Sequence, residues 1–196
     1  CSFVSFFDRR VLLCHELIKK LGENGFLGSY VPEEYGGAGM DYLSYAMIVE
    51  EISRACGSTG VLVSAHTSLG VWPILEFGNE EQKKKYLPKL VTGAYMGAYC
   101  LTEPGAGSDA NSGKTKAELT SDGKHYKITG QKMWISNAPF AQIAVVWAKD
   151  ETGRIHGLVV ERGMEGFSTP EMHGKLSLRA SATGELIFDN VKVPKE

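Results

Sequence analysis

The spacing of apolar residues changes near residue 95, and this change constrains the fold more than any other feature of the sequence. Before that point apolar side chains recur every three or four positions, which is the period of an amphipathic helix. From about Gly97 onward they alternate with polar side chains, which is the period of a half-buried strand. The sequence therefore predicts an α+β protein, with a helical domain over residues 1–95 and a β domain over residues 96–196.

Two apolar stripes in the first domain indicate helices. Leu13, Leu17 and Leu21 recur at every fourth position, and Gly22 and Gly25 after them supply the stop. The second stripe follows Asp41, a candidate N-cap. It consists of Tyr42, Tyr45, Ala46, Val49, Ile52 and Cys56.

A further helix is expected to begin after Asn79, where Glu80-Glu81-Gln82 places acids in the first turn. Its inward face consists of Tyr86, Leu87 and Leu90. Pro88 is expected to kink or break this helix, because proline cannot donate a backbone hydrogen bond. The run Lys83-Lys84-Lys85 lies opposite the apolar face, so we interpret it as a solvated helix face rather than a basic patch.

The second domain is expected to hold five or more short strands joined by turns. The candidate strands cover residues 114–120, 126–134, 141–148, 155–160 and 185–193, with turn signals at residues 121–123 and 150–153. Alternation in the second of them places Tyr126, Ile128, Gly130, Lys132 and Trp134 on one face. Such a set of strands describes a small antiparallel barrel or sandwich.

Composition excludes several classes of protein. The chain has 21 Lys+Arg against 23 Asp+Glu, a net charge of −2, and 43% hydrophobic residues, which is ordinary for a globular protein. We therefore expect no nucleic-acid partner, because there is no excess of positive charge to bind phosphates. No stretch approaches the ~20 apolar residues of a membrane helix, and the start of the chain does not match a secretory signal. We therefore expect no membrane partner.

The cysteines and histidines predict neither disulfides nor a metal site. The four cysteines, Cys1, Cys14, Cys56 and Cys100, form no C-x-x-C pair, so we expect reduced thiols in a cytosolic or matrix compartment. The five histidines show neither H-x-x-x-H nor H-E-x-x-H spacing.

Two glycine motifs resemble nucleotide-binding loops but lack the required context. Residues Gly105 to Ala110 match G-x-G-x-x-A, yet that fingerprint needs a following helix, and residues 112–120 alternate as a strand. Residues Gly107 to Thr115 resemble a P-loop with one residue too many between the glycines, which disrupts the nest of N–H groups around a phosphate. We expect neither motif to bind a nucleotide in its usual way.

The segment Tyr99 to Ser108 is still unlike a plain loop. It is a strand that opens into a run of small residues with exposed N–H groups and hydroxyls. Such a loop suits one flat, hydrogen-bonding, phosphate-bearing ligand. A glycine-rich β-turn with no ligand is the alternative interpretation.

Two segments of the β domain resemble a known family. Tyr99 to Asp109 (YCLTEPGAGSD) and Lys132 to Asn137 (KMWISN) are similar to the flavin-contacting segments of acyl-CoA dehydrogenases. The resemblance continues, in order, through residues 25–28, 31–37, 77–83 and 186–194, and so covers nearly the whole chain. Cys1 to Arg10 departs from the family's first helix.

The resemblance implies a helical N-terminal domain, a middle β domain and a C-terminal four-helix domain, with FAD held between them. Only the first two are matched here, and the family carries its catalytic glutamate in the third. We therefore expect this chain to lack the base, to contain no catalytic residue and to be inactive alone. The family also implies an acyl-CoA substrate, an electron-transfer flavoprotein as acceptor and a homotetramer, located in the cytoplasm of a bacterium or in the mitochondrial matrix of a eukaryote.

The resemblance also implies which residues bind FAD. They are Tyr99, Leu101, Thr102, Gly107, Ser108, Trp134, Ile135 and Ser136. N–H groups near Leu101 and Thr102, with the Thr102 hydroxyl, would stabilise negative charge on the N1/C2 edge of the flavin. Ser108 would touch the cofactor phosphates or bound acyl-CoA.

Trp134 would offer a flat face to the flavin ring, and Ser136 a hydroxyl where the family usually has threonine. Two structural alternatives remain open. Trp134 can instead be a β-core tryptophan, as we expect of Trp147. Thr102 can be a strand threonine whose hydroxyl caps the Glu103-Pro104 turn.

The substrate is expected to be an uncharged short or cyclic acyl thioester. Leu176 to Gly184 is most similar to glutaryl-CoA dehydrogenases, which place an arginine in the segment aligned with Ser58-Thr59-Gly60. Here no basic residue lies between Arg54 and Lys83, so a substrate carboxylate would be left unpaired in a desolvated pocket. The alternative is that the chain is a non-catalytic FAD- or CoA-binding or oligomerisation fragment.

Overall fold

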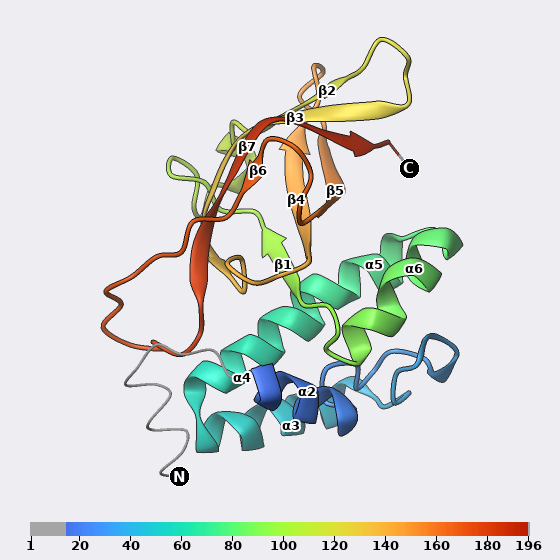
Figure 1. The fold of residues 1–196 in the computed structure, drawn as a ribbon, viewed down its shortest axis with the longest axis vertical. Helices are drawn as coiled ribbons and strands as arrows, with labels where there is room; N and C mark the ends of the chain where they lie inside the picture. The colour runs from blue at the N-terminus through green and yellow to red at the C-terminus, as the bar shows by residue number, and fades with distance from the viewer. Residues whose placement is uncertain (1–14, 196) are drawn as a thin grey trace.

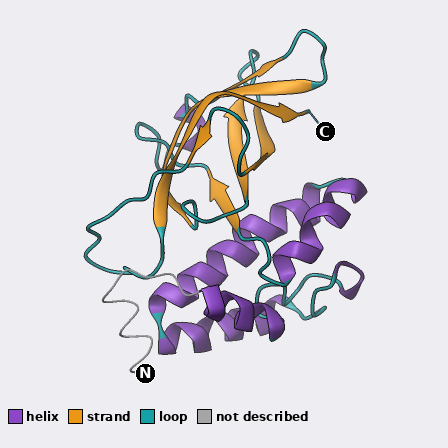
Figure 2. Ribbon diagram, in the orientation of Figure 1, coloured by secondary structure: helices purple, strands orange, loops and turns teal. Residues whose placement is uncertain are grey.

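The computed structural model describes residues 15–195, and it places a group of helices against a curled β-sheet (Figures 1 and 2). The α+β architecture predicted from the change in apolar period is confirmed. Several residues named above lie outside the described residues: the segment Cys1 to Arg10, Leu13 and Cys14. Within the described residues, no helix is both long enough and apolar enough to cross a membrane.

The helices precede the strands, as expected. In chain order they are α2 (His15–Glu23), the 3-10 helix η1 (Glu33–Tyr35), α3 (Tyr42–Ala55), α4 (Gly57–Ser64), the π-helix η2 (Ala65–Val71), α5 (Trp72–Phe77) and α6 (Glu80–Val91). The segments α4, η2 and α5 follow one another without a gap and form the long helix of Figure 1. The π-helical turn lies just before Pro73, whose ring and missing N–H disrupt a regular α-helical ladder.

Local sequence signals set the helix ends. Gly25, with φ +74°, follows α2, where Phe26 N–H donates to Leu21 O at 3.0 Å. The Asp41 carboxylate accepts from Ser44 N–H at 2.7 Å and caps α3. At the start of α6, Asn79 forms a reciprocal capping box with Gln82. These three predicted signals are confirmed.

Two expectations about the helices need correction. α6 runs through Pro88 to Val91 without a break, so of the two outcomes expected at Pro88, a kink or a break, the break is wrong. α3 is a helix, but its apolar stripe is not buried: Tyr42 is 64% exposed, and none of the residues of α3 is buried. The spacing therefore predicted the helix correctly, but the apolar stripe does not mark a buried face.

The lysine run in α6 also differs from a simple solvated face. Lys84 is exposed, but Lys85 Nζ lies 2.7 Å from the Glu161 carboxylate of the β domain. The Tyr86 hydroxyl donates to the same carboxylate at 2.8 Å. Lys85 and Tyr86 therefore bind α6 to strand β5 (Ile155–Glu161) of the sheet through Glu161.

The strands form one seven-stranded sheet. They are β1 (Gly97–Cys100), β2 (Lys116–Leu119), β3 (His125–Ser136), β4 (Ile143–Lys149), β5 (Ile155–Glu161), β6 (Phe167–Ser168) and β7 (Thr183–Pro194), with a 3-10 turn η3 (Ala110–Ser112) before β2. The order is β1-β4-β2-β3-β7-β6, and β5 pairs with β4. Most pairs are antiparallel, but β4 runs parallel to both β1 and β2.

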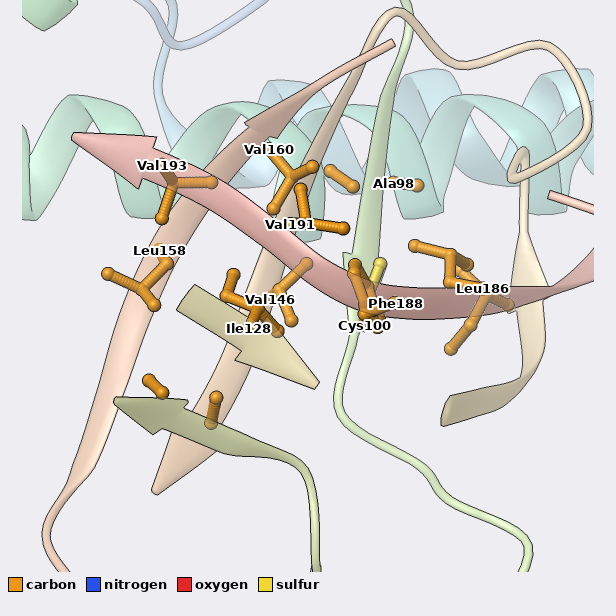
Figure 3. Packing of buried hydrophobic residues seen from close by; sticks show 14 of the residues in the cluster. Ala98, Cys100, Ile128, Val146, Leu158, Val160, Leu186, Phe188, Val191 and Val193 are labelled. Carbon is orange, nitrogen blue, oxygen red and sulfur yellow. The ribbon is translucent and has the colours of Figure 1, made fainter. Parts of the chain in front are cut away.

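β4 is buried on both faces and so joins two hydrophobic cores. Ala144, Val146 and Ala148 point into the core inside the curled sheet, where Figure 3 shows side chains from several strands converging. Ile143 and Val145 belong instead to a cluster shared with the helices. Burial on both faces explains why this strand is a continuous apolar run rather than an alternating one.

Glycine allows the helices and the sheet to approach closely at one point. A Cβ atom on Gly70 of η2 would lie 2.9 Å from Gly97 Cα of β1, and the same holds in reverse at 3.0 Å. Beside this contact, the buried His66 ring connects three elements. Gly97 N–H donates to Nδ1 at 3.1 Å, and Nε2 lies 3.1 Å from the Leu90 carbonyl of α6. The start of β1 is therefore fixed against the long helix.

Candidate functional site

The candidate site begins where β1 ends and its chain turns away from the sheet. After Cys100, the backbone of Glu103 and Ala106 exchanges two hydrogen bonds, Glu103 N–H to Ala106 O at 3.0 Å and Ala106 N–H to Glu103 O at 3.1 Å. These bonds close a tight turn around Pro104 and Gly105. Small residues follow, and Gly107 and Ser108 are exposed.

A buried ion pair holds this turn against β3. Lys132 Nζ lies 2.8 Å from Glu103 Oε1, and the two side chains are only 2% and 7% exposed. Glu103 also accepts from Lys114 N–H at 2.5 Å and Thr115 N–H at 3.0 Å. Burial alone would raise the pKa of Glu103, but the hydrogen bonds from Lys132, Thr115 and Lys114 outweigh it and lower the pKa to about 2.

The two segments singled out by the sequence lie side by side. Met133 N–H donates to Thr102 O at 2.9 Å, and Lys132 Nζ donates to Leu101 O at 3.1 Å. Leu101 and Thr102 are therefore bound directly to the stretch of β3 that leads into Trp134, Ile135 and Ser136. The structure brings together residues that are about thirty positions apart in the sequence.

Trp134 does not share the buried face of β3, so that prediction is wrong for this residue. The register with β7 shifts between Lys132 and Ile135, which indicates a β-bulge. Within the bulge Trp134 has φ +58° and is 65% exposed, while Ile135 returns to the core at 3%. A left-handed conformation is strained for tryptophan, and exposure excludes a β-core role. This exposed residue directly follows Met133, whose N–H is bonded to Thr102 O.

The hydroxyls at the site are free to bind a ligand. No hydrogen bond to protein is made by the side-chain hydroxyls of Thr102, Ser108 or Ser136 anywhere in residues 15–195. The alternative in which the Thr102 hydroxyl caps the following turn is therefore wrong. In the small-residue loop, the N–H groups of Gly105, Gly107 and Ser108 also have no backbone partner among the described residues.

The space around the loop is open as well. A Cβ atom added to Gly105 or Gly107 would meet nothing within 4 Å. The site thus combines an exposed flat ring, free hydroxyls and free N–H groups beside open space. That donor set fits a flat, phosphate-bearing ligand such as FAD.

Tyr99 takes a different place from the other candidates. Its half-buried ring packs on Trp147, with the ring centroids 5.9 Å apart, and both rings lie against the cluster shared with the helices. Trp147 is also in contact range of Gly157 on β5. Tyr99 therefore supports the strand that leads into the site, and Trp147 is a packing residue, as expected.

Sequence reasoning missed the part played by Glu103 and Lys132. One signal was present: Lys132 falls on the same alternating face as Tyr126 and Ile128, which are both buried. A lysine on a core-facing position needs a partner, and Glu103 is the only acidic residue in the segment Tyr99 to Ser108.

Comparison with known families agrees with this geometry. Residues 7–94 match the model for the acyl-CoA dehydrogenase N-terminal domain, and residues 98–191 match the model for the acyl-CoA dehydrogenase middle domain. The chain belongs to the acyl-CoA dehydrogenase family. The two matched domains correspond to the helices and to the sheet, in that order.

Individual relatives are also similar. A probable acyl-CoA dehydrogenase of Bacillus subtilis is 49% identical over 92% of this chain and 30% of its own length. The mitochondrial isovaleryl-CoA dehydrogenase of Pongo abelii is 46% identical over 91% of this chain and 43% of its own length. The crystal structure of an acyl-CoA dehydrogenase complexed with FAD from Bacillus anthracis is 47% identical, with a TM-score of 0.88, over 96% of this chain and 32% of that one. The chain thus spans less than half the length of these relatives.

Proposed function

We propose that the protein containing this chain is an FAD-dependent acyl-CoA dehydrogenase, and that residues 15–195 supply the flavin-holding part of its active site. The reaction is α,β-desaturation of an acyl-CoA thioester, with the hydride accepted by FAD. The observation that carries the proposal is the contact between the Thr102 segment and the Trp134 segment, made by the Met133 N–H to Thr102 O bond. A solved relative with 47% identity contains FAD.

Within this proposal the residues have separate tasks. Trp134 packs on the flavin ring, and the Ser136 hydroxyl binds its polar edge. The Thr102 N–H and hydroxyl are fixed donors for the negative charge that develops during hydride transfer. Gly107 and Ser108 present N–H groups and a hydroxyl to phosphates, and Ser108 also contacts acyl-CoA. Leu101, Ile135 and Tyr99 shape the pocket and hold the strands in place.

The base that removes the α-proton is proposed to come from outside these residues. Glu103 is the carboxylate nearest to Thr102 in the sequence, and it is the one buried in the site. It is buried against Lys132, and its pKa of about 2 makes it a poor proton acceptor at neutral pH. We therefore propose that the isolated chain has no dehydrogenase activity.

The substrate is proposed to be an uncharged short-chain or cyclic acyl-CoA. Ser58 and Gly60 are buried in α4, and no lysine or arginine lies between Arg54 and Lys83. His66 cannot supply a positive charge at neutral pH, because burial lowers its pKa to about 4. A substrate carboxylate at this helix would therefore remain unpaired.

The partners are proposed from the family. We propose an electron-transfer flavoprotein as the electron acceptor and a homotetramer as the assembly. The compartment is proposed to be the cytoplasm in a bacterium or the mitochondrial matrix in a eukaryote, in keeping with relatives from Bacillus subtilis and from a mitochondrion.

The visible absorption spectrum tests the proposal. The complete protein, purified or reconstituted with FAD, is expected to show the bands of oxidised flavin and to lose them when an acyl-CoA substrate is added. A polypeptide of residues 1–196 alone is expected to bind FAD weakly or not at all, because its match covers only 32% of the length of the relative that contains FAD. A colourless complete protein would contradict the flavin assignment. Flavin that acyl-CoA does not bleach would favour a non-catalytic binding role.

A further inference from the structure

Two consecutive carbonyl groups at the site are held by neighbouring residues of β3. Lys132 Nζ donates to Leu101 O at 3.1 Å, and Met133 N–H donates to Thr102 O at 2.9 Å. The peptide group between Leu101 and Thr102 is therefore fixed at its carbonyl end by an ammonium group. Few backbone carbonyls accept from a lysine that is only 2% exposed.

The orientation of that peptide group follows from its geometry. There are no cis peptide bonds in residues 15–195, and in a trans peptide the C=O and N–H point in opposite directions. Since Leu101 O points toward Lys132, the Thr102 N–H points away from the buried ion pair. In the described part of the chain this N–H has no backbone partner.

The charge on Lys132 also acts through the peptide group. A donor on the carbonyl oxygen draws electron density from the amide, so the N–H at the other end becomes a stronger donor, by about 10–30% in condensed-phase estimates. A bond from a charged ammonium is stronger than a neutral one. The Glu103 carboxylate accepts from the buried Lys132 Nζ and balances its charge, and its own bonds from Lys114 and Thr115 N–H fix its place.

Stability alone does not account for the pair. A buried ion pair contributes little net stability compared with well-packed apolar side chains of similar size, because both charges lose their hydration. Methionine at position 132 would fill much of the same space.

We infer that Lys132 is a positioning residue for the flavin: with Glu103 balancing its charge, it orients and polarises the Leu101–Thr102 peptide so that the Thr102 N–H favours reduced over oxidised flavin. This inference rests on the proposed function, because it takes FAD as the ligand. If the inference is right, removing Lys132 and Glu103 changes the reduction potential of bound flavin and leaves the fold intact.

The test compares two pairs of substitutions in the complete FAD-loaded protein. Lys132→Met with Glu103→Gln removes the pair at the site, and no bare charge is left buried. Lys85→Met with Glu161→Gln makes the same chemical changes at the ion pair between α6 and β5. The midpoint potential of the flavin is measured by redox titration, with a thermal melt of each variant alongside.

We expect the Lys132/Glu103 variant to weaken reduced relative to oxidised flavin by about tenfold, which for a two-electron couple makes the midpoint potential about 30 mV more negative. The Lys85/Glu161 variant is expected to keep the wild-type potential, even if its melting temperature falls.

If the Lys132→Met/Glu103→Gln variant does not fold, Lys132→Gln with Glu103→Gln is used instead. It retains an amide donor and is expected to shift the potential in the same direction by less. A folded, flavin-loaded variant at position 132 with an unchanged potential would overturn the inference. A wild-type protein that binds no FAD would instead overturn the proposed function.

Discussion

At the scale of single residues, Thr102 combines features that a structural threonine does not need. Its carbonyl accepts from Met133, while its hydroxyl has no protein partner within residues 15–195. Thr102→Val retains the β-branched shape and removes that hydroxyl. We expect the complete Thr102→Val protein to fold and to keep most of its flavin, but its flavin should be reduced more slowly when acyl-CoA is added. One donor acting on developing charge in a dry site is worth about 2.7–4 kcal/mol. Stopped-flow reduction measures the effect, and an unchanged rate with a lower melting temperature would show a structural role.

Trp134 combines an exposed aromatic ring with a strained backbone, so stability and binding should respond in opposite directions. The backbone of Trp134 has φ +58°, a conformation that costs a non-glycine residue of order 1–3 kcal/mol. Glycine adopts the same conformation without strain. We expect Trp134→Gly to leave the melting temperature of flavin-free protein unchanged or higher, and to raise the dissociation constant for FAD. Trp134→Phe keeps a ring and should retain more of the affinity. Loss of stability with unchanged FAD affinity would contradict this role.

The residue scale also shows what the sequence could not reveal. Motif similarity identified Thr102 and Trp134, but alternation placed Trp134 on the buried face. A single bulge between Lys132 and Ile135 reverses that placement, and no residue type in the segment signals it. The pairing of Lys132 with Glu103 depends on two segments meeting in space, so spacing along the chain did not predict it.

At the scale of elements, the capping signals were reliable, whereas apolar spacing matched burial in α6 but not in α3. The caps at Asp41 and Asn79 are short-range interactions, and both form as expected. Burial of α3 depends on which other element covers it, and its apolar spacing carries no such information. The parallel pairing of β1 with β4 likewise depends on the path of the chain between them rather than on either strand.

The contact of η2, α6 and β1 at His66 predicts how stability depends on pH. Leu90 O can only accept and Gly97 N–H can only donate, so the neutral ring carries its proton on Nε2. Protonation of Nδ1 would break the bond from Gly97. Burial lowers the His66 pKa from 6.5 to about 4. Between these values the unfolded chain binds a proton that the folded chain does not.

We therefore expect the free energy of unfolding to be insensitive to His66 above pH 6.5 and to fall as the pH drops from 6.5 toward 4. The total contribution is about 3 kcal/mol, at 1.36 kcal/mol per pKa unit. Urea unfolding at several pH values measures the slope. His66→Gln, which retains a donor and an acceptor, should lower stability at neutral pH and reduce the slope in this window. A slope unaffected by the substitution would assign it to other groups.

At the scale of the whole molecule, the helices and the sheet share one hydrophobic cluster. The change in apolar period predicted a helical part followed by a β part, but not this packing of one against the other. The proposed roles divide between the layers. In the proposal, the segments at Thr102 and Trp134 hold the flavin, and the stretch of α4 around Ser58 and Gly60, which is buried, faces the acyl group. The choice of substrate therefore depends on the helical layer, which the flavin motifs do not describe.

The charge of that layer predicts substrate preference in the complete protein. With no lysine or arginine between residues 54 and 83 and His66 neutral, a buried carboxylate on the substrate would lack a partner, at a cost of about 3–5 kcal/mol. We expect kcat/KM for butyryl-CoA to exceed that for glutaryl-CoA by about a hundredfold or more. The monomethyl ester of glutaryl-CoA is the matched control, since it removes the charge and keeps the chain, and it should be turned over faster than glutaryl-CoA. A preference for glutaryl-CoA would mean that an arginine outside this helix pairs with the carboxylate, and the uncharged substrate class would then be wrong.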